Sequence, residues 1–167
     1  MRLALPLALL ALFAAACATA DSTAPGDVPE WARARTEAPD EFILYALHPS
    51  NFFSRDQAEL EALPRFHGYP ILGEVLLTDV PAREELVRLL WQTIDSDDGT
   101  RAHCFNPRHG IRATQDGMSA DWVICFECLS MHVIDDAGTQ VNLGGPSDVE
   151  PAFSSIYTDA GLQLDGQ

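Results

Sequence analysis

The feature that most constrains how this chain can fold is an Asp116-Gly117 pair between two β-rich runs. Asp-Gly in this setting predicts a type I′ hairpin turn, because both central residues of that turn need positive φ. We therefore expect residues 102–113 and 120–134 to form two antiparallel strands. Paired strands of this length predict that an antiparallel sheet is the centre of the fold.

Helical periodicity flanks this hairpin on both sides. Leu and Ile at helical spacing behind Pro81 predict a helix over about residues 80–95. A second apolar stripe, ending at Gly161, predicts a helix over about residues 148–160. The expected fold class is α+β: an antiparallel sheet with a central hairpin (about 102–134) and both helices on one face. Further strands are expected at residues 42–47, 66–80 and 141–143, and one helical turn near 56–62.

The N-terminus has the pattern of an export signal. Arg2 is followed by an apolar run over residues 3–13 and then by small residues up to Cys17. This predicts a signal peptide over residues 1–16, too short to be a stable transmembrane span. "AAAC" resembles a bacterial lipobox, which would make Cys17 the lipidated N-terminus. The alternative is ordinary cleavage after Ala20, which would release a soluble secreted or periplasmic protein.

A lipid on Cys17 would hold the protein on a membrane without spanning it. Residues 17–40 are rich in Pro and small polar residues and are expected to be the lipidated cysteine and a flexible tether. Residues 41–167 have the length of a single globular domain. In a Gram-negative cell, Ala18 in place of Asp favours the outer membrane, by resemblance to known lipoprotein sorting.

The charge balance excludes several classes of function. Ten Lys and Arg stand against 25 Asp and Glu, a formal net charge of −15. Such an acidic chain is not expected to bind nucleic acid or anionic lipid through a basic surface. The sequence holds no lysine, so Schiff-base chemistry and a phosphate-loop lysine are excluded on this chain.

Three of the four cysteines lie in the hairpin region. In an extended strand, Cys125 and Cys128 would point to opposite faces about 10 Å apart, whereas a disulfide needs Cα atoms within about 7 Å. The hairpin register puts Cys104 opposite Leu129, and a bulge near Pro107 would bring it opposite Cys128. One hypothesis is therefore a Cys104–Cys128 disulfide in an oxidising compartment, with Cys125 a free thiol.

A second hypothesis, exclusive of the first, uses the same residues as metal ligands. Cys104-x4-His109 and Cys125-x2-Cys128 would supply three sulfurs and one nitrogen, a possible tetrahedral zinc site. Zinc is the one cofactor that the sequence suggests. A third hypothesis is thiol-based catalysis, although redox C-x-x-C motifs begin helices and this one lies in a β-rich run.

The residues "CFNPRHGIR" and "VICFEC" resemble a motif of an uncharacterised family of bacterial secreted and lipoprotein-like proteins, CFxPRHxI…ICFxC. The resemblance extends from "FILYALHP" to the last helix and implies a coherent fold without implying an activity. It also implies that one local unit is formed by Cys104, Pro107, Arg108, His109, Cys125 and Cys128.

These features together predict an exported, lipid-anchored protein of the bacterial cell envelope. Its expected role is that of a non-enzymatic binding or structural module, with the membrane as a partner through the lipid. The alternatives are a zinc-binding protein that uses the Cys/His set, and a thiol-based enzyme.

Overall fold

The computed structural model of this protein describes residues 27–49 and 57–165. These residues form an α+β fold built on an antiparallel sheet. In these residues seven strands pair in the order β2-β3-β1-β4-β5-β6-β7, and every pair is antiparallel. The expected fold class is confirmed. The strands are β1 (Glu41–Leu47), β2 (Arg65–Phe66), β3 (Tyr69–Leu76), β4 (His109–Gln115), β5 (Met118–Cys125), β6 (Ser130–Asp135) and β7 (Gln140–Gly144).

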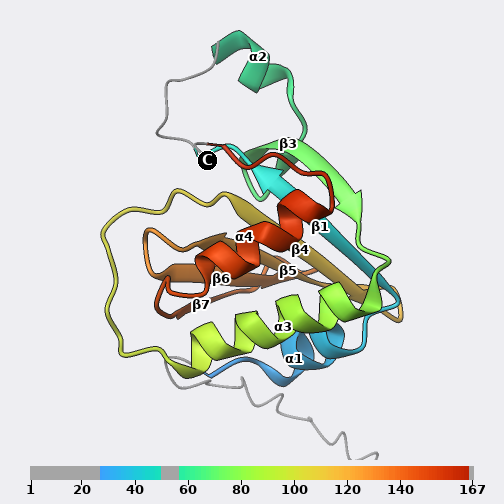
Figure 1. The fold of residues 1–167 in the computed structure, drawn as a ribbon, viewed down its shortest axis with the longest axis vertical. Coiled ribbons are helices and arrows are strands. Elements are labelled where there is room, and N and C mark those ends of the chain that lie inside the picture. The colour runs from blue at the N-terminus through green and yellow to red at the C-terminus, as the bar shows by residue number, and fades with distance from the viewer. Residues whose placement is uncertain (1–26, 50–56, 166–167) are drawn as a thin grey trace, which may run out of the picture.

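Three helices lie on one face of the sheet, as Figure 1 shows. They are α1 (Glu30–Glu37), α3 (Val80–Asp95) and α4 (Glu150–Asp159), while the short α2 (Gln57–Ala62) stands apart from them. The buried faces of α1, α3 and α4 and the alternate residues of the strands beneath them form the main core, which includes Leu44, Ile111 and Trp122. Among the described residues no helix has the length and apolarity that crossing a membrane would need.

The two predicted helices form close to where periodicity placed them. Asp79 caps α3, since its side chain accepts a hydrogen bond of 2.9 Å from the backbone N–H of Ala82, and Pro81 lies in the first turn. α4 begins two residues later than expected and ends before Gly161, whose φ is +91°. Both helices contribute to the same core, so their expected placement on one face is also confirmed.

The predicted turn at the tip of the β4–β5 hairpin is confirmed. Asp116 and Gly117 have φ values of +52° and +75°, and Gln115 pairs with Met118. This register places His109 opposite Ile124 at the far end of the hairpin. Because paired residues share a face, it decides which side chains meet the helices.

The predicted lengths of the two strands were wrong. β4 starts only at His109, so residues 102–108 lie outside the ladder. β5 ends at Cys125, and a turn over residues 126–129 reverses the chain into β6. Leu129 has a φ of +52°, a left-handed conformation that an uninterrupted strand does not contain. Residues 120–134 are therefore parts of two strands, where a single strand was expected.

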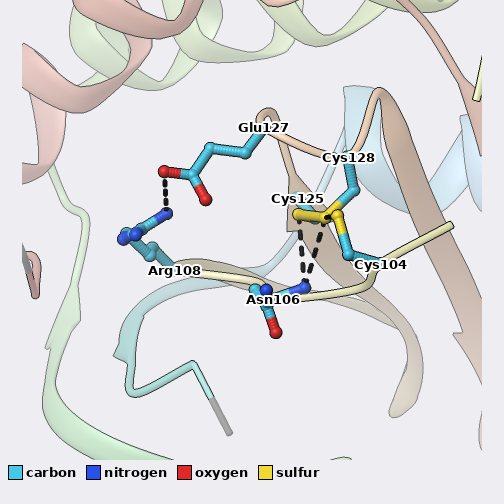
Figure 2. Close-up of a disulfide and its surroundings, with 6 residues drawn as sticks. All are labelled: Cys104, Asn106, Arg108, Cys125, Glu127 and Cys128. Atoms are coloured by element: carbon cyan, nitrogen blue, oxygen red, sulfur yellow. Dashed lines mark hydrogen bonds and ion pairs between the residues drawn. A yellow bond between two sulfur atoms is a disulfide. The ribbon is translucent and has the colours of Figure 1, made fainter. Parts of the chain in front are cut away.

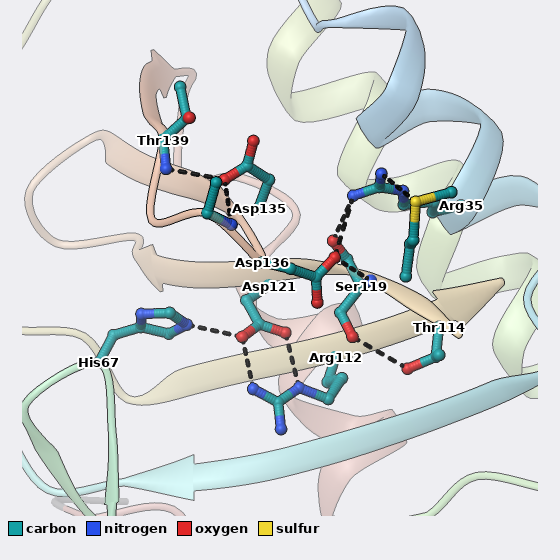
Figure 3. Close-up of polar contacts among 11 residues, drawn as sticks. Arg35, His67, Arg112, Thr114, Ser119, Asp121, Asp135, Asp136 and Thr139 are labelled. Carbon is teal, nitrogen blue, oxygen red and sulfur yellow. Dashed lines mark hydrogen bonds and ion pairs between the residues drawn. The ribbon is translucent and has the colours of Figure 1, made fainter. Parts of the chain in front are cut away.

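The folded part also begins earlier than the expected boundary at residue 41. Ala32 and Thr36 of α1 have no exposed surface, and Thr36 Oγ1 accepts a hydrogen bond of 3.0 Å from Trp122 Nε1. Arg35 donates to the backbone oxygen of Ser119 at 2.6 Å, a contact visible beside Asp136 in Figure 3. The second half of the expected tether is thus a helix that closes the core, because one of its faces carries small side chains that fit against the sheet.

Candidate functional site

Three sulfur atoms meet where β5 turns into β6. Cys125 ends β5, and Cys128 lies in the following turn with its N–H donating to the carbonyl oxygen of Cys125 at 3.2 Å. The turn brings their Cα atoms to 5.2 Å, and the two residues form a disulfide (Figure 2). With the Cys104 thiol beside them they make what we call the cysteine cluster: Cys104, Cys125 and Cys128.

This pairing differs from the expected Cys104–Cys128 disulfide. That expectation assumed an extended chain from Cys125 to Cys128, which would separate the two residues by about 10 Å. The turn over residues 126–129 shortens the separation to 5.2 Å, inside the range that a disulfide requires. The free thiol in the described residues is Cys104, where Cys125 was expected.

Cys104 is held against the disulfide by the segment that precedes β4. The N–H of Ala102 donates to the carbonyl oxygen of Cys128 at 3.1 Å, which fixes this segment to the turn. The Cys104 sulfur lies 2.9 Å from the Cys128 sulfur, and the residue is exposed. The backbone N–H of Asn106 lies 3.3 Å from the Cys125 sulfur and 3.4 Å from the Cys128 sulfur.

The fourth member of the proposed zinc set does not join the cysteine cluster. His109 pairs with Ile124, so its side chain lies on the helix-covered face, and Cys125, the next residue of β5, points to the other. His109 Nε2 is instead hydrogen-bonded to Ser154 Oγ of α4 at 3.0 Å. Among the described residues no group of three or more His, Cys, Asp or Glu side chains is arranged to hold a metal ion. The zinc site predicted from Cys104, His109, Cys125 and Cys128 is therefore not assembled in this structure.

His109 is a core residue. It is 1% exposed, and its ring makes edge contacts with Phe126, Phe153 and Tyr157. Burial lowers the pKa of His109 to about 3, and the positive charge of Arg108 acts in the same direction. The imidazole is therefore neutral at physiological pH and is not placed to exchange protons with a substrate.

Arg108 links the cysteine-bearing turn to the C-terminal segment. Its guanidinium forms an ion pair of 2.9 Å with Glu127, which lies between the two disulfide cysteines in the sequence (Figure 2). Its Nε also donates a hydrogen bond of 2.8 Å to the backbone oxygen of Asp165. Arg108 is only 9% exposed. Its pairing with a carboxylate agrees with the abundance of acidic residues in the chain, and it fixes the position of the turn that carries the disulfide.

A second polar cluster lies on the face of the sheet opposite the helices, which we call the second face. Asp121 accepts hydrogen bonds from Arg112 at 2.8 and 2.6 Å and from His67 at 2.7 Å (Figure 3). Burial raises the pKa of Asp121, but the hydrogen bonds from Arg112 and His67 outweigh it and leave the pKa below its usual value. Arg112 and Asp121 are cross-strand partners. The register set by the Asp116-Gly117 turn was therefore enough to predict this pair from the sequence. The contact with His67 was not predictable in this way, because His67 lies in the distant β2–β3 turn.

We expect Asp121→Asn to destabilise the fold at neutral pH by about 1–3 kcal/mol, because the Arg112 charge loses its buried partner. The half-exposed Arg112 side chain keeps the loss below the range for fully buried pairs. Because the folded-state pKa of Asp121 is depressed, its contribution is present above the unfolded value near pH 4 and is lost as the pH falls below it. Urea unfolding at about pH 7 and pH 3 measures both effects.

The matched control is Glu74→Gln, which removes an exposed carboxylate of the neighbouring β3. That change is expected to alter the free energy of unfolding by less than about 0.5 kcal/mol. An Asp121→Asn variant as stable as the Glu74→Gln variant at neutral pH would contradict the structural role given to the Asp121 cluster.

The lipidation candidate Cys17 and the signal peptide fall outside the described residues, which begin at residue 27. Comparison with protein-family models, curated proteins and solved structures finds no match to this chain.

Proposed function

We propose that this chain is an exported protein of the bacterial cell envelope, anchored by a lipid on Cys17, whose folded part is a non-enzymatic binding or structural module. The observation that carries the proposal is the order of features at the N-terminus. A charged residue, an apolar run and small residues lead to Cys17, and the first helix of the fold follows shortly after it. This is the order in a membrane-tethered domain.

The length of the tether supports a domain held close to its membrane. Residues 18–29 separate Cys17 from α1. Fully extended, such a segment spans at most about 40 Å. Because α1 is packed into the core through Ala32 and Thr36, it adds nothing to the reach of the tether.

The roles of the polar side chains support a non-enzymatic module. His109 is neutral in the core, Asp121 is saturated by Arg112 and His67, and Arg108 joins two segments of the chain. Each of these groups has a hydrogen-bonding role within the fold. Their arrangement serves the stability of the sheet and its turns.

We expect the full chain, expressed with its own N-terminus in a Gram-negative host, to sediment with membranes, and Cys17→Ser to appear in the soluble envelope fraction. The physical reason is that stable attachment depends on the acyl chains on Cys17. Fractionation by sucrose gradient and the intact mass of the membrane form measure this. The membrane form should begin at Cys17 and carry lipid.

The control is Cys104→Ser, which also removes one cysteine and should leave the protein with the membranes. A mature mass that begins at Asp21, or a wild-type membrane form that carries no lipid, would overturn the lipid anchor. The first of these outcomes would establish the soluble secreted or periplasmic form.

A further inference from the structure

We propose that the cysteine cluster is a thiol–disulfide exchange site in which Cys128 is the shared sulfur and Cys125 and Cys104 are its alternative partners. The structure holds one form, with Cys125 and Cys128 joined and Cys104 free. The other form joins Cys104 to Cys128 and leaves Cys125 as the thiol. This activity is separate from membrane anchoring and does not depend on the lipid at Cys17.

The placement of the attacking thiol is the first argument. Exchange requires a thiolate to approach one sulfur of a disulfide, with the other sulfur as the leaving group. The Cys104 sulfur lies 2.9 Å from the Cys128 sulfur and has no comparable contact with Cys125 in the described structure. The Ala102 and Cys128 backbones are hydrogen-bonded at 3.1 Å, so the segment carrying Cys104 is fixed to the turn that carries its target. Cys128 is therefore the sulfur that is attacked.

The environment of the leaving group is the second argument. When the Cys125–Cys128 bond breaks, negative charge develops on the Cys125 sulfur. The N–H of Asn106 lies 3.3 Å from that sulfur and 3.4 Å from Cys128, as the dashed lines in Figure 2 show. A backbone N–H in this position stabilises a developing thiolate.

The step is balanced without any other reagent. Cys104 loses its proton, its sulfur bonds to Sγ of Cys128, and the Cys125–Cys128 bond breaks with its electron pair on the Cys125 sulfur, which takes up a proton. One disulfide and one thiol are present before and after the step, so nothing is oxidised or reduced overall.

The exchange changes which thiol the surroundings meet. Cys104 is exposed, whereas Cys125 is 2% exposed. In one form the cluster presents an accessible thiol, and in the other its thiol is buried beneath the turn. The consequence is a site whose reactivity toward external thiols, disulfides and oxidants depends on the position of its disulfide.

Disulfide mapping of the full chain tests this proposal. The protein is incubated without reductant, quenched with acid, denatured, alkylated at low pH and mapped by mass spectrometry. The expected result is two different disulfides in the sample, one joining Cys125 to Cys128 and one joining Cys104 to Cys128. Their ratio should be reached about tenfold faster for each pH unit of increase below the thiol pKa, because the thiolate is the attacking species.

Two variants keep the result independent of how the wild-type equilibrium lies. Cys125→Ser should form a Cys104–Cys128 disulfide, and Cys128→Ser, which lacks the shared sulfur, should keep Cys104 and Cys125 as thiols. A Cys125→Ser variant that leaves Cys104 and Cys128 as free thiols overturns the proposal. So does a Cys104–Cys125 link in Cys128→Ser, and so do three free thiols with a bound zinc ion. A failure of the lipidation test leaves these outcomes unaffected, since they concern different cysteines.

Discussion

Lowering the pH from about 7 to about 5 is expected to reduce the free energy of unfolding by about 2 kcal/mol, through His109. Burial holds the pKa of His109 at about 3 in the folded state, against about 6.5 in the unfolded chain. Below the unfolded value the unfolded state binds a proton that the folded state does not. Stability therefore falls with pH from about 6.5 down to the folded value, at up to about 1.4 kcal/mol per pH unit.

Urea unfolding at a series of pH values, followed by circular dichroism, measures this slope. His109→Gln has no titrating group, so its free energy of unfolding should vary less between about pH 7 and pH 5. That variant also loses ring contacts with Phe126, Phe153 and Tyr157, so the slope is compared and the absolute stability is not. Burial also lowers the pKa of His132, and His132→Gln separates its smaller contribution of the same sign. A His109→Gln variant with the wild-type slope would show that His109 protonates freely in the folded chain.

Trp122→Ala is expected to cost about 3–5 kcal/mol, a large part of the about 5–15 kcal/mol that stabilises a typical domain. Trp122 has no exposed surface and lies in β5 under the helices. Its ring meets Trp91 of α3 edge to face at 5.6 Å, and its indole N–H donates to Thr36 of α1 at 3.0 Å. Removing it leaves a cavity where two helices and the sheet meet, and the midpoint of urea unfolding reports the loss.

Two smaller substitutions separate the contribution of the indole hydrogen bond from that of the buried ring. Thr36→Val removes the acceptor of the indole hydrogen bond and is expected to cost about 1–3 kcal/mol, since the indole N–H is then buried without a partner. Trp122→Phe keeps an aromatic ring and should cost less than Trp122→Ala. A Trp122→Ala variant within about 1 kcal/mol of the wild type would mean that α1 and α3 do not depend on this contact, contrary to the packing described here.

Local signals predicted the elements whose form depends on nearby residues. Positive φ at Asp116 and Gly117 is a requirement of the turn itself, so the hairpin tip was correct to the residue. The helix over residues 80–95 was correct because its apolar stripe and its first-turn proline both act within a few turns. The fold class followed from these elements, since packing helices on an antiparallel sheet buries the apolar face of the sheet against the apolar stripes of the helices.

Sequence predictions were wrong where particular side-chain contacts outweigh local propensity. Helix α1 has little apolar periodicity of its own, and it is stabilised by Trp122, more than eighty residues along the chain. The turn after Cys125 interrupts a run rich in β-forming residues, because the disulfide and the backbone hydrogen bonds of the turn over residues 126–129 outweigh the local preference for a strand. The predicted register of this hairpin is kept, but β4 begins only at His109 and β5 ends at Cys125. The predicted zinc site and Cys104–Cys128 disulfide assumed an extended chain beyond those points, where the structure has a turn.

The sequence by itself determined the hairpin tip, the two long helices, the acidic charge and the grouping of three cysteines in one region, because each depends on composition or on residues a few positions apart. Tertiary structure decided which sulfurs bond, where His109 points and where the domain begins. Those outcomes depend on where each strand ends and on which face a side chain occupies, and a one-residue shift in strand register moves every side chain of the strand to the other face.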